Sequence, residues 1–286
     1  MKRLFRYVFD YLIFANWFIS LAAISLTLET YLMINKPIKI DGLLFFIFFS
    51  TLFEYNLQRH FSIIKIKTET PPEKIHWALK NGGPFKGTFY ASIVGLVISV
   101  FFINPVILLV IAPLGLITIA YSIPLIKTKA ERIRLRELPM VKILFVALVW
   151  GFTTVLLPVI DAGLPLFTSN VFYMLARRIL FVYAITIPFD IRDKDDDTTE
   201  GLKTLPILIG NRKSQGVAIV LLLLFSVLVF LQYNSLSNNF ALPLYVSVIT
   251  ASILILQSRQ DNGRYFHYFW MDGTMIFQFL LILIFA

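Results

Sequence analysis

The sequence predicts an all-α integral membrane protein, with about nine transmembrane helices in two parallel, repeat-like halves. Three observations lead to this fold class. Of the 286 residues, 58% are hydrophobic and only 15% are charged, and the mean hydropathy is +0.77, far from the balance of a soluble domain. Apolar runs of roughly 17 to 25 residues, the length that crosses a bilayer, recur along the chain. The basic residues gather in every second loop between these runs, and therefore on one side of the membrane.

The apolar runs predict nine spans that divide one polytopic domain, residues 1–286, into halves of about 1–141 and 142–286. The first run follows a basic flank but exceeds the apolar length of a signal peptide, so it is expected to be a retained span. The expected spans are 11–33, 41–56, 87–104, 105–121, 142–160, 169–188, 216–233, 241–257 and 267–286.

The loops predict the orientation. With a cytoplasmic N-terminus, most of the 26 lysines and arginines lie on the cytoplasmic side, and the opposite side shows only Lys36 and Lys39. The positive-inside rule therefore places the N-terminus in the cytoplasm, and we expect a bacterial cytoplasmic membrane. The same distribution excludes a nucleic-acid partner, because the basic loops suit lipid headgroups. The chain has no cysteine, so thiol chemistry is excluded.

An acidic stretch, "FDIRDKDDDTTEGLKTLP" at 189–206, follows the sixth run on the cytoplasmic side. Asp190, Asp193 and Asp197 are spaced so that a helix continuing that run would place them on one face. Such close carboxylates need a cation between them. Oxygen ligands without His or Cys favour Mg²⁺ with a substrate phosphate, which Lys203 could also contact. The alternative is a solvated or calcium-attracting loop. The neighbours expected to be solvated are Asp195, Asp196 and Glu200.

A polar cluster, "FEYNLQRH" at 53–60, follows the second span on the same side. Its offset of four spans from the acidic stretch is typical of a parallel repeat. A third segment, "AYSIPLIKTKAERIRLRELPMVKILFVALVW" at 120–150, contains a basic loop. That loop is either an ordinary positive-inside connection or part of a site, and Tyr121 before it either binds a substrate or anchors at the interface.

At these residues the sequence resembles the UbiA-type intramembrane prenyltransferases. The resemblance rests on "YSIP" with "RLRELPMVK", on the second aspartate-rich motif "IPFDIRDKDDDTTEGLKTLPILIG", and on "YFHYFWMDGTMI". It implies nine helices around a central cavity. It also implies Mg²⁺-dependent transfer of a prenyl group from a prenyl diphosphate to a lipophilic acceptor, aromatic or a quinone precursor. On this basis Asp190, Asp193 and Asp197 are expected to hold the metal and to be catalytic.

The first motif of that family, N-x-x-x-D-x-x-x-D, is degenerate in this chain. Asn56 fits the pattern, but His60 and Ile64 stand where the two aspartates belong. We expect Arg59 and His60 to contact the diphosphate directly in place of a bridging metal, beside Asn56. The alternative is that they are flanking charges of the positive-inside kind.

Three polar residues lie inside apolar runs. Arg177 and Arg178 match no motif of the family, and snorkelling or pairing with Asp161 is the expected explanation. Asn16, in the first run, is expected either to line the cavity or to bond a neighbouring helix.

Two other functions compete with prenyl transfer. One is a family member that binds a prenyl diphosphate or lipid without turnover, because the missing carboxylates removed the chemistry. The other is a transporter, for which the sequence offers little, since acids inside the spans are nearly absent. The sequence does not predict the acceptor, the prenyl chain length or the oligomeric state.

Overall fold

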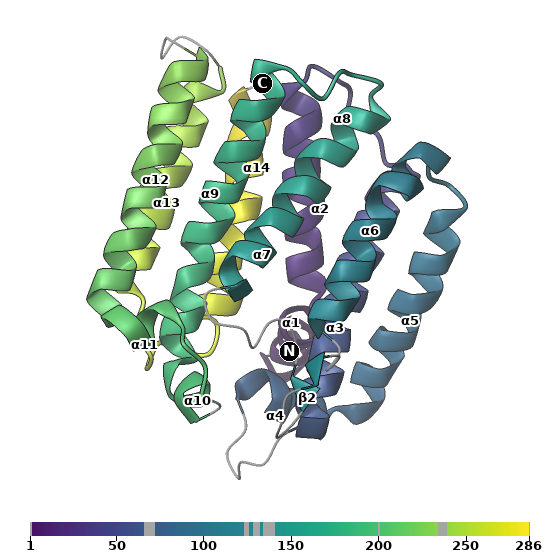
Figure 1. The fold of residues 1–286 in the computed structure, drawn as a ribbon. Coiled ribbons are helices and arrows are strands. Elements are labelled where there is room, and N and C mark those ends of the chain that lie inside the picture. Colours follow the sequence, from purple (N-terminus) through teal and green to yellow (C-terminus); the bar gives the residue numbers. More distant parts are fainter. Residues whose placement is uncertain are drawn as a thin grey trace. The chain divides into compact units, whose positions relative to one another are not determined.

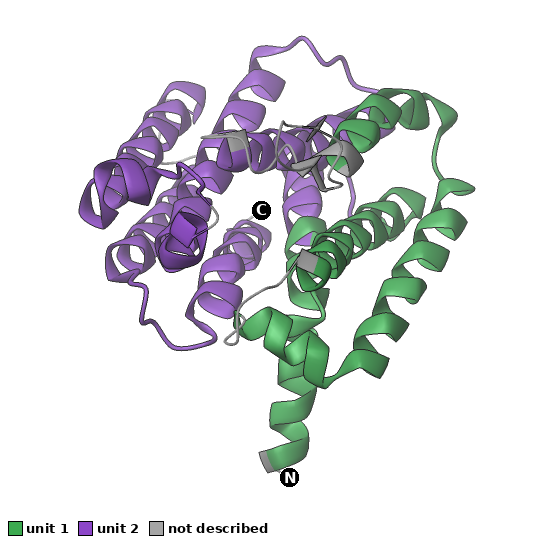
Figure 2. Cartoon of the chain, turned by 60° about the horizontal axis from the view of Figure 1, so that its bottom comes forward, with its two compact units in different colours: residues 1–24, 39–134 green, residues 25–38, 135–286 purple. Residues whose placement is uncertain are grey.

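The computed structural model of the chain describes residues 2–65, 72–122, 126–127, 132–133, 141–199, 201–233 and 239–285. It contains two compact units, coloured separately in Figure 2. Unit 1 comprises residues 1–24 and 39–134, and unit 2 comprises residues 25–38 and 135–286. The division falls within one helix, so the second unit begins earlier in the sequence than the predicted half at 142.

Unit 1 consists mainly of helices. Their bounds are α1 Lys2–Phe14, α2 Trp17–Met33 (which continues into unit 2), α3 Gly42–Lys65, α4 Glu73–Lys80, α5 Gly82–Val100 and α6 Pro105–Ser122. In Figure 1, α3, α5 and α6 are seen as neighbouring helices. The predicted third and fourth spans correspond to α5 and α6, and residues 101–104 separate these helices, with Pro105 as the first residue of α6.

The basic loop of unit 1 adds a short strand pair to the predicted helices. Strand β1, Ile126–Lys127, pairs antiparallel with β2, Arg132–Ile133. Ile126 lies opposite Ile133, and Lys127 lies opposite Arg132. Among the described residues, the fold is therefore helical with one two-stranded ladder, in a segment that the sequence analysis predicted to be a loop.

The first apolar run is broken at Asn16. Asn16 adopts a left-handed backbone conformation with φ 69°, and the helices on either side of it form an angle of 60°. Asparagine tolerates this conformation better than most residues because its short side chain bonds locally. The break therefore arises from the sequence, and it turns a buried amide toward the core of unit 1.

Close packing in unit 1 depends on a glycine at the start of α3. A Cβ added at Gly42 would lie 2.2 Å from the backbone oxygen of Phe102. By contrast, a Cβ at Gly82 at the start of α5 meets no atom within 4 Å. The α3 glycine therefore permits an approach between backbones that any side chain would prevent.

We expect Gly42→Ala to lower the stability of the protein by about 1 to 3 kcal/mol, because the new methyl group must displace backbone rather than a flexible side chain. The measurement is the thermal unfolding midpoint in detergent. Gly82→Ala is the matched control and is expected to leave the midpoint unchanged or slightly higher. Equal midpoints for the two variants would contradict the packing explanation.

In unit 2, all the regular secondary structure of the described residues is helical. Its elements are the second part of α2, α7 Val141–Gly151, the π-helical segment η2 Phe152–Leu156, α8 Leu157–Asp161, α9 Ser169–Arg192, α10 Lys194–Thr199, α11 Leu205–Ile209, α12 Asn211–Tyr233, α13 Ala241–Gln257, the π-helical segment η3 Phe266–Met271 and α14 Asp272–Phe285. Helix α9 packs against α7 and α12, as Figure 1 shows.

Helix α9 begins with a side-chain cap and is held by an aromatic core. The hydroxyl of Thr168 accepts a hydrogen bond from the Val171 amide at 3.3 Å, which satisfies one of the free donors of the first turn. Further along, Phe181 and Phe225 of α12 are each 1% exposed, with ring centroids 5.8 Å apart. This packing positions the polar end of α9, where the acidic stretch begins.

A proline explains the π-helical turn between α7 and α8. In a regular α-helix the carbonyl of Thr154 would accept a hydrogen bond from residue 158, but Pro158 has no amide hydrogen. The hydroxyl of Thr30 in α2 donates to this carbonyl instead, at 2.7 Å. The freed backbone acceptor thus connects α2 to the α7–α8 span.

Five helical segments of the described residues are long and apolar enough to cross a membrane, or six if the bent α1–α2 pair is one span. They are 82–100, 142–161, 169–192, 211–233 and 266–285. Helix α13 is apolar but only 17 residues long. The count of nine spans and the repeat-like halves therefore remain predictions.

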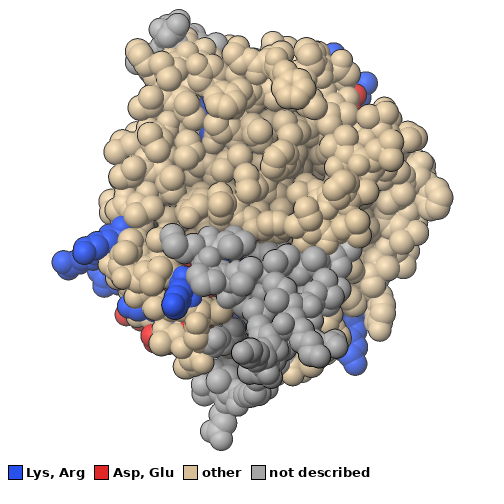
Figure 3. All heavy atoms as spheres, in the orientation of Figure 1, with Lys and Arg blue, Asp and Glu red and all other residues tan. Residues whose placement is uncertain are grey.

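The surface agrees with a membrane environment. Figure 3 shows a visible face on which atoms of residues other than Lys, Arg, Asp and Glu predominate. Large apolar side chains of α12 are exposed, as a lipid-facing helix requires. They are Val220, Leu223, Leu224, Val227, Phe230 and Leu231.

Candidate functional site

The acidic stretch places two carboxylates around one lysine in unit 2. Asp190, in the last turn of α9, lies 2.8 Å from the Nζ of Lys142. Asp197, in α10, lies 3.7 Å from the same nitrogen. Both carboxylates are buried, and Lys142 comes from the first turn of α7. The cation expected among the aspartates is therefore supplied, in part, by the protein itself.

Asp193 does not join the other two carboxylates. Helix α9 ends at Arg192, Asp193 is its C-cap, and α10 begins at Lys194. The Arg192 guanidinium donates two hydrogen bonds to the Asp193 carboxylate, from Nε at 2.6 Å and from Nη2 at 2.8 Å. The predicted continuous helix with three carboxylates on one face is thus interrupted, because the chain leaves the helix at Asp193.

The Arg192 ion pair lowers the pKa of the Asp193 carboxyl. Burial alone would raise this pKa, because it disfavours the charged form. The neighbouring charge and hydrogen bonds of Arg192, together with Lys142, outweigh burial and bring the pKa below its ordinary value. Asp193 therefore stays ionised, and its charge serves to hold Arg192.

Aromatic rings surround this ion pair. The Arg192 guanidinium carbon lies 4.5 Å from the ring centroid of Tyr268 and 5.2 Å from that of Phe189. The ring of His267, in η3, lies 5.6 Å from Phe189. The segment "YFHYFWMDGTMI" thus contributes buried rings beside the acidic stretch, and it does so from a π-helical turn of the kind that is frequent at functional sites.

Unit 1 contains a separate polar cluster around the helix break. The side-chain amide of Asn16 donates to the Asn56 oxygen at 3.1 Å, and the Asn16 oxygen accepts from Arg59 at 2.6 Å. All three side chains are buried. Asn56 also donates to the carbonyls of Ala15 and Leu52, at 3.2 Å and 2.8 Å. Of the two roles expected for Asn16, the structure shows hydrogen bonding to a neighbouring helix.

The other predicted ligands of the diphosphate lie in different surroundings. His60 is exposed, and its ring stacks on Phe89 with centroids 5.8 Å apart. Lys203 is exposed after α10. The Tyr121 side chain lies outside the described residues, as does most of the basic loop at 128–140 apart from the backbone of β2. The described structure therefore brings Asn56 and Arg59 together but leaves His60 at the surface.

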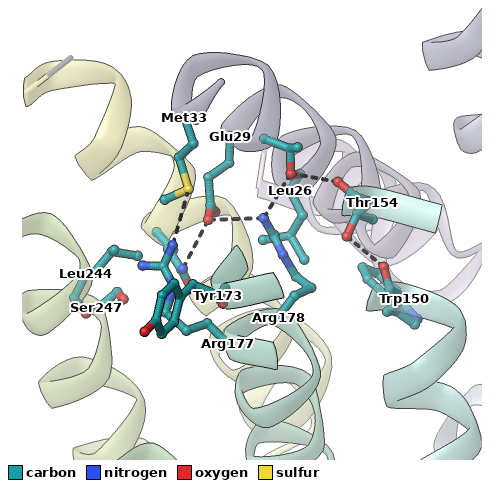
Figure 4. Close-up of polar contacts among 12 residues, drawn as sticks. Leu26, Glu29, Met33, Trp150, Thr154, Tyr173, Arg177, Arg178, Leu244 and Ser247 are labelled. Carbon is teal, nitrogen blue, oxygen red and sulfur yellow. Dashed lines mark hydrogen bonds and ion pairs between the residues drawn. The ribbon is translucent and has the colours of Figure 1, made fainter. Parts of the chain in front are cut away.

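A buried charged cluster in unit 2 was missed by the sequence analysis. Glu29 in α2 accepts from Arg178 at 3.1 Å and from Gln278 of α14 at 3.3 Å. Figure 4 shows Glu29 and Arg178 pointing toward each other from their two helices. Arg177 contacts Tyr233 of α12 at 3.4 Å. Glu29 is thus an acid buried within the first apolar run, and the sequence analysis assigned it no role.

Asp161 is not the partner of either arginine. Its carboxylate accepts a hydrogen bond from the Tyr31 hydroxyl at 2.8 Å. Arg177 and Arg178 are 3% and 5% exposed, so they do not snorkel to the surface. The predicted pairing with Asp161 is therefore wrong. The signal that could have identified Glu29 is its position, since an acid in an otherwise apolar run requires a buried partner.

The apolar spans and the buried polar groups at the C-terminal end of α9 define the class of protein, an integral membrane protein with a polar site at its helix ends. The family follows from a direct match. The model of the UbiA prenyltransferase family matches residues 87–271, and the chain belongs to this family.

Solved structures support the fold. A UbiA homologue from Archaeoglobus fulgidus, bound to GPP and Mg²⁺, has a TM-score of 0.66 at 13% identity, over 96% of this chain and 99% of that chain. A digeranylgeranylglyceryl phosphate synthase has a TM-score of 0.56 at 18% identity, over 99% and 98%. The apo UbiA homologue from Aeropyrum pernix K1 has a TM-score of 0.55 at 12% identity, over 93% and 97%. No curated protein matches the chain.

Proposed function

We propose that this protein is a membrane prenyltransferase that transfers a prenyl group from its diphosphate to a lipophilic acceptor and requires Mg²⁺. The observation that supports this most strongly is the convergence of Asp190 and Asp197 on one cationic atom, the Nζ of Lys142. The second aspartate-rich motif of the family thus forms a cation-binding point at the end of α9. The UbiA homologue from Archaeoglobus fulgidus was solved with a prenyl diphosphate and Mg²⁺, which accords with the proposal.

Magnesium fits Asp190 and Asp197 better than it fits Asp193. The first two carboxylates share one cation, whereas Arg192 engages both oxygens of Asp193. Within the described ranges, no three His, Asp or Glu side chains are grouped to hold a metal. The remaining ligands would be water and substrate phosphate, as is usual for Mg²⁺. When bound, the ion would neutralise charge developing on the diphosphate leaving group.

The protein must also protect an allylic cation from water once the diphosphate leaves. Phe189 and Tyr268 present rings beside the acidic stretch, with centroids 6.4 Å apart. Aromatic faces attract a cation by about 0.5 to 2 kcal/mol per contact and exclude water from the site. We therefore assign these two side chains to the exclusion of water, while Asp193 holds Arg192, which lies against both rings.

In unit 1, the family resemblance and the charge of "NLQRH" suggest that Asn56, Arg59, His60 and Tyr121 bind a diphosphate. In unit 2, Lys203 stays a predicted phosphate contact by itself. The Arg59 guanidinium is oriented by Asn16, and His60 is accessible. Arg59 and His60 would replace a bridging metal with cationic donors. If Arg59→Ala and His60→Ala bound a prenyl diphosphate as tightly as the wild type, this assignment would fail.

A second candidate function is binding of a prenyl diphosphate or lipid without turnover. The observation that favours it is the replacement of both aspartates of the first motif by His60 and Ile64. The loss of two carboxylates removes possible metal ligands. Without a metal, ionisation of the prenyl diphosphate would be slower or absent.

The leading proposal, prenyl transfer, also includes an aromatic or quinone-precursor acceptor. It places the N-terminus and the acidic stretch in the cytoplasm.

The test is a turnover assay with purified protein in detergent. Labelled prenyl diphosphates of several chain lengths are incubated with Mg²⁺ and a panel of aromatic and lipid acceptors. We expect a prenylated product that depends on Mg²⁺ and disappears with EDTA. Saturable binding of a donor without product from any acceptor would favour the binding-only function. Absence of both binding and turnover would overturn the assignment.

A further inference from the structure

Lys142 occupies the position at which a metal would meet the second aspartate-rich motif. Its Nζ lies 2.8 Å from an oxygen of Asp190 and 3.7 Å from an oxygen of Asp197. The side chains of these aspartates are 2% and 9% exposed, whereas that of Lys142 is 28% exposed. The acids are therefore fixed in the interior, while the lysine keeps a route to solvent.

Two cations of the chain already face the carboxylates of the acidic stretch. Three carboxylates, those of Asp190, Asp193 and Asp197, face the cations of Lys142 and Arg192. Asp272 also acts on the charge of Arg192. A divalent ion bound to Asp190 and Asp197 would therefore meet the ammonium of Lys142 at close range, and two cations at that distance repel each other strongly where water is scarce.

Lysine is suited to leave such a position. Its ammonium is a compact charge on a flexible four-carbon chain, with three rotatable donors and no fixed geometry. Lys142 lies in the first turn of α7, Val141–Gly151, so its backbone is at the end of a span. An anion beside the site would give the displaced ammonium a new partner, because phosphate oxygens accept hydrogen bonds from ammonium groups.

We propose that Lys142 is an internal cation that a divalent metal must displace from Asp190 and Asp197. The metal then binds weakly alone and more tightly when a diphosphate accepts the released ammonium. This last step rests on the proposed function, whereas the competition between Lys142 and the metal does not. Lys142 thus couples the arrival of metal and diphosphate, and it neutralises the buried aspartates between catalytic cycles.

The test measures Mn²⁺ binding without any diphosphate, by the loss of the free-ion electron paramagnetic resonance signal. We expect Lys142→Met and Lys142→Gln to bind Mn²⁺ at least about tenfold more tightly than the wild type, since one nearby positive charge is removed. The control Lys213→Met removes an exposed lysine of α12, and it should leave the affinity unchanged. Adding Asp190→Asn to Lys142→Met should abolish the gain.

A measurement on the wild type keeps the proposal testable if the variants do not fold. An amine-reactive reagent labels the lysines, and mass spectrometry compares Lys142 with Lys213. We expect saturating Mg²⁺ to raise the labelling of Lys142 relative to Lys213, because the ammonium leaves its carboxylate partners. Unchanged labelling, or variants that bind Mn²⁺ no more tightly than the wild type, would overturn the proposal. A protein without turnover that still shows the Lys142 effect would contradict only the proposed function.

Discussion

Asp190→Asn is expected to reduce prenyl transfer on the order of 100-fold or more, with little change in the amount of folded protein. The substitution keeps the shape of the side chain but removes the charge that would hold the metal at the leaving group. Losing one such electrostatic contact in a site from which water is excluded typically costs a factor of this size. The carboxylate of Asp190 is only 2% exposed, so solvent cannot replace it. The measurement is product formation from a labelled prenyl diphosphate under saturating Mg²⁺.

Asp195→Asn is the matched control for this variant. Asp195 lies in the same acidic stretch but is exposed, and its carboxylate accepts a hydrogen bond from Gln260 at 3.1 Å. Removing its charge should change the rate by less than about twofold, because solvent screens it. Thermal unfolding of both variants separates lost chemistry from lost folding. Similar rates for Asp190→Asn and the wild type would remove Asp190 from the catalytic site.

Breaking the Glu29–Arg178 pair is expected to have the largest effect on stability. Glu29→Leu leaves the guanidinium of Arg178 buried without its carboxylate partner. Arg178→Leu leaves the carboxylate of Glu29 buried without its guanidinium partner. Removal of one partner of a buried ion pair typically costs about 3 to 5 kcal/mol. Both side chains are nearly inaccessible, at 2% for Glu29 and 4% for Arg178. The measurement is the unfolding of each variant in detergent by heat or denaturant.

The double variant distinguishes the pair from simple packing. If the pair is the cause, Glu29→Leu with Arg178→Leu should lose less stability than the sum of the single variants, since neither charge is then left alone. Arg212→Leu, an exposed arginine of α12, is the control and should be nearly neutral. Strict additivity of the two substitutions would show that the ion pair itself contributes nothing.

The helical membrane class could be predicted from the sequence because hydropathy is a sum over local residues. In lipid, a long apolar run can adopt few backbone conformations, because every backbone polar group needs a hydrogen-bond partner. A helix provides these partners within its own segment. The runs at 169–188 and 216–233 accordingly lie within α9 and α12. Broken helices are less visible in such a sum. Asn16 divides the first apolar run into two helices that form an angle of 60°. Pro158 produces a π-helical turn in another apolar run.

The sequence predicted that carboxylates of the acidic stretch meet a cation, but it did not predict which carboxylates or which cation. The spacing of Asp190, Asp193 and Asp197 assumed an unbroken helix, whereas Asp193 lies between α9 and α10 and its carboxylate pairs with Arg192. The partner of the other two, Lys142, lies 48 residues before Asp190. A spacing rule within one segment cannot identify a partner from another span.

By itself, the sequence determined the membrane class, the family and the position of the aspartate-rich motif, because each depends on residues close together in the chain. Only the tertiary structure decided which charges meet: Lys142 with Asp190 and Asp197, Arg192 with Asp193, and Glu29 with Arg178. The physical reason is the cost of burying a charge. A charge inside the spans needs an opposite charge or a polar group as its partner, and the packing of helices distant in sequence selects that partner.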